Sequence, residues 1–144
     1  MKLLVALDFS PASQAVLTIA EQQARALAAK LYLIHVVAPD PDFVGYEVGP
    51  QSVRDAVAHE YRDQHRQLQE AADKLRQAEV DTTALLVQGP TGQTLLEEAA
   101  KLGADLLVIG SHGHGAVYDL LVGSVSHWIL QNTFLPVLVV PIRR

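Results

Sequence analysis

Hydrophobic residues follow two alternating patterns along the chain. Short apolar runs occur at residues 3–7, 31–37, 82–88, 105–109 and 137–140. Such runs are typical of strands that are covered on both faces, as in a parallel sheet. Between the runs, apolar residues recur at helical spacing and polar residues occupy the other positions.

The amphipathic stretches predict helices that alternate with these strands. Ser10 (followed by Pro11), Ser52 and Thr91 are suitable N-caps, because their hydroxyls accept hydrogen bonds from a first helical turn. Gly103 and Asn132 favour the left-handed conformation that often ends a helix. The predicted helices run to about residues 29, 78, 102 and 131, the last one from Ser124, and the longest irregular segment is 38–51.

The order of elements predicts an α/β fold. Strands and helices alternate from one end to the other without repeats or linkers, so we expect residues 1–144 to form one domain. The expected architecture has three layers, with helices on both faces of an open, parallel, five-stranded sheet. Ligands of such sheets bind beyond the carboxyl ends of the strands, where the strand order reverses.

A glycine-rich loop follows the run at 105–109. Gly110, Gly113 and Gly115 precede Gly123-Ser124, where the last helix begins. Glycines let backbone N–H groups approach a bound group, and a helix start adds unpaired donors, so the loop suits an anion. Ser124 can offer its hydroxyl to a phosphate or cap the helix itself.

Two common nucleotide fingerprints do not fit this loop. A P-loop requires a lysine before the serine, and Ser124 follows Gly123 instead. A dinucleotide fingerprint that starts at Gly113 meets Tyr118 where its third glycine belongs.

The spacing does match another pattern. Gly110 and Gly113 are followed by nine residues and then by Gly123-Ser124. In this the chain resembles the ATP-binding branch of the universal stress protein family, over nearly its whole length. The resemblance implies a Rossmann-like fold of the adenine nucleotide alpha hydrolase type, with strand order 3-2-1-4-5. It also implies a homodimer joined through the terminal strand Val137–Val140.

The resemblance also assigns a nucleotide site. The ligand it implies is ATP, with AMP or ADP as alternatives, and Mg²⁺ held mainly by the phosphates rather than by a protein metal site. By the resemblance, the main chain of Val36 contacts the edge of the adenine, and backbone N–H groups together with the Ser124 hydroxyl bind the phosphates. The residues assigned to the site are Ala6, Asp8, Val36, Ile109, Gly110, Gly113, His114, Gly123, Ser124 and Val125.

Four polar residues have more than one possible role. Asp8 ends the first strand and can accept hydrogen bonds from a ribose or an adenine amine, or it can bracket the turn into the first helix. His114 stands where relatives often carry a basic residue, and residues 110–124 contain no Lys or Arg. His112 and His114 could be metal ligands, but two histidines without an acidic or cysteine partner nearby are too few for a typical metal site. We expect His35 to be a buried, hydrogen-bonded residue rather than a catalyst.

Composition and charge exclude several function classes. The net charge of −5 argues against nucleic acid or an anionic membrane as the main partner. No apolar run approaches the ~20 residues of a membrane span, so a cytoplasmic protein is expected. There is no cysteine, which removes disulfides and thiolate chemistry.

We therefore expect a nucleotide-binding regulatory protein of the stress response, without catalytic residues or dedicated turnover. One alternative is a slow ATP-hydrolysing enzyme, although residues 7–11 lack the Ser-Gly-Gly type of loop that related hydrolases carry after their first strand. The other alternative is a dimeric interaction module of the same family that binds no nucleotide.

Overall fold

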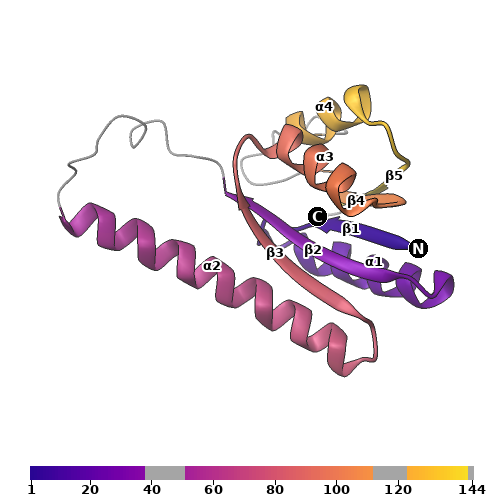
Figure 1. Cartoon of the computed structure of the whole chain (residues 1–144), viewed down its shortest axis with the longest axis horizontal. Helices are drawn as coiled ribbons and strands as arrows, with labels where there is room; N and C mark the ends of the chain where they lie inside the picture. Colours follow the sequence, from indigo (N-terminus) through magenta and orange to yellow (C-terminus); the bar gives the residue numbers. More distant parts are fainter. Residues whose placement is uncertain (38–50, 112–122, 143–144) are drawn as a thin grey trace.

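The computed structural model describes residues 1–37, 51–111 and 123–142, apart from the side chains of 51–57. Strands and helices alternate strictly along these residues, which confirms the α/β class (Figure 1). The elements are β1 (Lys2–Ala6), α1 (Ser13–Leu27), β2 (Lys30–Val37), α2 (Gln51–Gln77), β3 (Thr82–Gln88), α3 (Thr91–Leu102), β4 (Leu106–Gly110), α4 (Ser124–Asn132) and β5 (Val137–Val140).

The strands form one parallel sheet in the order β3-β2-β1-β4-β5, which confirms the order implied by the resemblance. The chain builds outward from β1 to β3 and then returns to place β4 on the other side of β1. Val5 of β1 pairs with Leu33 of β2 and with Val108 of β4. The strand order therefore reverses between β1 and β4, and their carboxyl ends lie side by side.

Two hydrophobic layers cover the two faces of the sheet. Helices α1 and α2 lie on one face and α3 and α4 on the other (Figure 1). Successive residues of β1 divide between the layers, because side chains of a strand alternate in direction. Leu3 and Val5 pack toward α1 and α2, whereas Leu4 packs toward α3 and α4, and all three are fully buried.

The start of α1 differs from the prediction. Ser10 is not its N-cap, because the helix begins at Ser13 after Ala12. The Asp8 carboxylate instead accepts the Ser10 N–H at 2.9 Å and the Ser13 hydroxyl at 3.2 Å, so a turn precedes the helix. The Ser10 hydroxyl is buried without a hydrogen bond within the described residues. The Asp8 carboxylate, two residues before Ser10, therefore takes the place of the predicted N-cap.

Other predicted helix ends also shift. Pro90 is the N-cap of α3, so Thr91 is its first helical residue rather than the cap. α4 begins at Ser124 as predicted, and Gly123 is its N-cap. Asn132 does not end α4 in a left-handed conformation. Its side chain donates to the Trp128 carbonyl at 2.8 Å, and Thr133 then leaves the helix in an extended conformation. The stop at Gly103 is confirmed, with φ of 66°.

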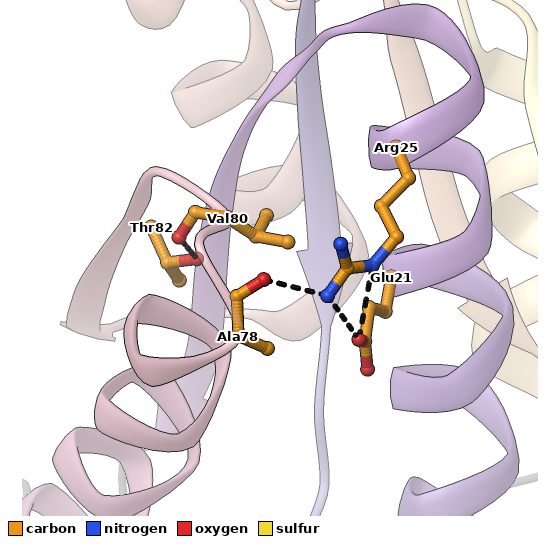
Figure 2. A network of polar contacts seen from close by, with 5 residues as sticks. All are labelled: Glu21, Arg25, Ala78, Val80 and Thr82. Carbon is orange, nitrogen blue, oxygen red and sulfur yellow. Dashed lines mark hydrogen bonds and ion pairs between the residues drawn. The ribbon is translucent and has the colours of Figure 1, made fainter.

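A polar contact joins the two helices on one face (Figure 2). The Arg25 guanidinium of α1 donates to the Glu21 carboxylate at 3.1 and 3.2 Å, and to the Ala78 carbonyl beyond α2 at 2.6 Å. Nearby, the Thr82 hydroxyl donates to the Val80 carbonyl at 2.9 Å. The contact is largely exposed, so it fixes the end of α2 beside α1 more than it stabilises the fold.

Gly89 links β3 to α3 in a conformation that side chains resist. Its φ is +156°, and a Cβ at this position would collide with the Thr94 hydroxyl. We expect Gly89→Ala to lower the free energy of unfolding by about 3 kcal/mol, from backbone strain and overpacking together. Urea denaturation measures this loss.

Gly103→Ala is the matched control, because Gly103 also has positive φ but open space around its Cβ position. Strain alone should cost about 1–2 kcal/mol there. Adding Thr94→Ala to Gly89→Ala should recover part of the loss. Equal losses for the two glycine variants would contradict the proposed collision.

Candidate functional site

The polar group nearest the end of β1 is Asp8. The Leu7 N–H donates to the Ile34 carbonyl at 2.9 Å, so β1 stays attached to β2 up to Asp8. Asp8 is half-buried and its Oδ1 holds the turn before α1. One of the two interpretations of Asp8, the structural one, is therefore observed, and its role toward a nucleotide stays a prediction.

An aromatic pair lies beside this turn. Phe9 has a left-handed φ of 60°, and its ring centroid lies 4.6 Å from that of His35. The His35 Nδ1 lies 2.7 Å from the Leu7 carbonyl, and since a carbonyl only accepts, Nδ1 carries a proton. His35 is hydrogen-bonded as predicted, but it is only partly buried. Sequence reasoning missed Phe9, because no spacing rule marks it.

The end of β4 is held by backbone hydrogen bonds. The Ser111 N–H donates to the Val140 carbonyl at 2.9 Å, and the Gly123 N–H donates to the Ser111 carbonyl at 2.6 Å. The buried Ser126 hydroxyl of α4 donates to the Gly110 carbonyl at 2.8 Å. These contacts bring the start of α4 to the end of β4. Sequence reasoning missed both Ser111 and Ser126, which carry no motif signal.

The sheet brings most of the predicted site residues to one edge. Ala6 of β1 pairs with Ile34 of β2. Asp8, just beyond β1, and Val36 of β2 each follow that pair by two residues. Ile109 and Gly110 end β4 on the other side of β1. Ser124 and Val125 form the first turn of α4 and are exposed.

Some predicted residues cannot be placed. Gly113 and His114 lie outside the described residues, as do His112 and Gly115. Val36 and Ile109 are buried in the layer beneath α3 and α4, so their side chains also have a packing role.

The edge has the donors of an anion site but little side-chain charge. No side chain caps α4 within the described residues, and the first N–H groups of a helix carry the positive end of its dipole. Among the described residues, no three His, Cys, Asp or Glu side chains are grouped to hold a metal ion. In the same part of the chain, no helix has both the length and the apolarity of a membrane span.

We expect Asp8→Ala to destabilise the fold by about 1–2 kcal/mol, because the Ser10 N–H and the Ser13 hydroxyl lose their shared acceptor. Asp8→Asn keeps an oxygen at this position and should cost less. Thermal or urea unfolding compares the two variants, and Ser13→Ala isolates the hydroxyl contact. An Asp8→Ala variant as stable as wild type would contradict the bracketing role.

Comparison with known proteins bears on the family and the fold. A universal stress protein of Thermus aquaticus is 31% identical over 144 residues, with 96% of each chain covered. A crystal structure of a universal stress protein in complex with cAMP has a TM-score of 0.71 and 27% identity, and covers 98% of this chain and 96% of that one. The structure of an Archaeoglobus fulgidus universal stress protein in complex with dAMP has a TM-score of 0.67 and 20% identity, with 97% of each chain covered, a likeness of fold. The family model of the universal stress proteins matches residues 1–141, and the chain belongs to that family.

Proposed function

We propose that the chain is a regulatory protein that binds an adenine nucleotide, with ATP as the main ligand, at the carboxyl ends of β1, β2 and β4. The observation that supports this most is the placement of Asp8 and the start of α4, which no side chain of the described residues caps, at the point where strand order reverses. Open α/β sheets bind ligands at that point. The relative in complex with cAMP adds support for an adenine nucleotide as the ligand class.

Each part of the nucleotide has a proposed partner. Asp8 accepts hydrogen bonds from the ribose, and the main chain of Val36 contacts the adenine edge, with Ala6 and Ile109 beside them. The phosphates take the N–H groups of Gly110, Gly113 and Val125 and the Ser124 hydroxyl. Gly123 lies beside them at the start of α4, but its N–H is already paired with the Ser111 carbonyl. Helix starts suit such oxygens, because unpaired N–H groups and the helix dipole both favour negative charge.

The charge of the phosphates must be balanced largely without Lys or Arg. Residues 110–124 contain neither, and His114 occupies a position where relatives are often basic. We propose Mg²⁺ bound mainly by the phosphates for this role, since that ion keeps several waters and needs few protein ligands.

We propose binding without dedicated turnover. Among the described residues at this edge, the buried Ser126 hydroxyl donates to a backbone carbonyl, which is not a base. An activated nucleophile would instead be paired with a base that takes its proton. Slow ATP hydrolysis is the second candidate, and phosphate release that exceeds that of a non-binding variant would favour it.

Gly123→Val tests the phosphate site. The side chain would add bulk at the N-cap of α4, where the backbone is extended and accepts it without strain. We expect at least a tenfold weaker Kd for Mg-ATP, or about 1.4 kcal/mol. Trp128 is the single tryptophan and is 40% exposed on α4, so its fluorescence can report binding.

Leu130→Ala is the matched control, because Leu130 is an exposed residue of the same helix, away from its first turn. Mass spectrometry of small molecules released from the denatured wild-type chain identifies any resident nucleotide. An empty chain that also binds no added Mg-ATP would overturn the proposal and favour the interaction module.

We propose further that two copies of the chain associate through β5, the last strand in the sheet. Pro136 and Val140 direct their carbonyls at β4, with N–H donors at 3.0 and 2.9 Å. Since backbone groups alternate along a strand, Val137 and Val139 direct theirs to the open edge. The nearby Phe134 is 62% exposed, and apolar edges of this kind are usually covered.

Val139→Pro should shift the chain toward monomer. Proline removes an N–H that faces the open edge and is tolerated on edge strands, so the bond to β4 is kept. A symmetric dimer would lose the contact twice, which raises its Kd by about tenfold or more. Sedimentation over a range of concentrations measures this shift. Val139→Thr keeps the N–H and serves as the control, and a monomeric wild type would contradict the dimer.

A further inference from the structure

The peptide that joins Gly110 to Ser111 is held from both sides. Its carbonyl accepts from the Ser126 hydroxyl of α4 at 2.8 Å, and its N–H donates to the Val140 carbonyl of β5 at 2.9 Å. A peptide unit is planar, so two opposed hydrogen bonds fix the direction of the whole plane. The orientation of this peptide at the end of β4 is therefore fixed by its contacts with α4 and β5.

Only one of these two contacts comes from a side chain. Ser126 is 6% exposed, and it lies in the first turn of α4, two residues after Ser124. Its hydroxyl reaches a carbonyl sixteen positions away in sequence.

The hydrogen bond from Ser126 to Gly110 helps to set the position of α4. The Gly123 N–H donates to the Ser111 carbonyl at 2.6 Å, directly beside the Ser126 contact. Together the two hydrogen bonds join residues 110–111 to residues 123–126, and they set where the first N–H groups of α4 stand relative to β4. A phosphate that bridges Gly110 and α4 would depend on that spacing, since hydrogen bonds weaken steeply with misalignment.

We propose that Ser126 is a positioning residue for the nucleotide: its hydroxyl holds the start of α4 at the end of β4, so that the phosphate donors of both elements converge. This inference rests on the proposed function and adds a residue to it. Ser126 touches no phosphate itself, because its hydroxyl is directed to the Gly110 carbonyl.

The test compares Mg-ATP binding by wild type, Ser126→Ala and Thr82→Val, each well below its unfolding temperature. Thr82→Val removes another buried hydroxyl that donates to a carbonyl, at the opposite end of the sheet. We expect Ser126→Ala to bind about threefold to tenfold more weakly, the worth of one hydrogen bond, while Thr82→Val keeps the wild-type Kd. If Ser126→Ala weakened binding only through a general loss of stability, Thr82→Val would weaken binding to a similar extent.

A second measurement needs no ligand. Amide hydrogen exchange at Gly123 should be faster in Ser126→Ala than in wild type, because the neighbouring contact that holds this N–H is gone. If the alanine variant folds poorly, Ser126→Cys keeps the shape with a weaker donor, and the chain has no other cysteine to complicate it. The Kd of Ser126→Cys should then lie between the wild-type value and the value expected for Ser126→Ala.

The outcomes separate the two proposals. Unchanged Mg-ATP affinity in Ser126→Ala, or equal losses in Ser126→Ala and Thr82→Val, would overturn the positioning role and leave the nucleotide site intact. A wild-type chain that binds no adenine nucleotide would overturn the proposed function and this inference with it.

Discussion

The pairing of β1 on both of its edges is the constraint on which the rest of the structure depends. Leu3, Leu4 and Val5 are fully buried, and they divide between the hydrophobic layers on the two faces of the sheet. Because β1 lies between β2 and β4, its end is also the place where strand order reverses. The same short strand therefore contributes side chains to both hydrophobic layers and sets the position of the candidate site.

The site that follows from this arrangement consists mainly of backbone groups. Strand ends and helix starts leave carbonyls and N–H groups that must find partners. At the end of β4 these partners are Val140, Gly123 and Ser126, and at the end of β1 the Asp8 carboxylate holds the turn before α1. The fold thus already uses the polar groups at this edge, where the proposed nucleotide site lies.

The strands were predictable from the sequence, since short runs of consecutive apolar residues between turn signals are typical of buried strands. Strand order was not, because pairing across the sheet is non-local, and the family resemblance supplied it. Helix starts were the weakest part, since Asp8 took the hydrogen bonds expected of Ser10, and Gly123 holds the cap position that was one of two roles open to Ser124. Ser126 could not be found, as nothing in a sequence links it to the Gly110 carbonyl.

The hydrogen bonds between residues 110–111 and 123–126 affect which changes in sequence the fold tolerates between them. They already bring the two ends of the intervening segment together, so the entropy of closing that segment is met by contacts outside it. Lengthening a closed loop adds only about 0.6 kcal/mol for each doubling. A change in the number of residues between 111 and 123 would thus cost the fold little, so the end of β4 and the start of α4 can keep their places while the sequence between them differs.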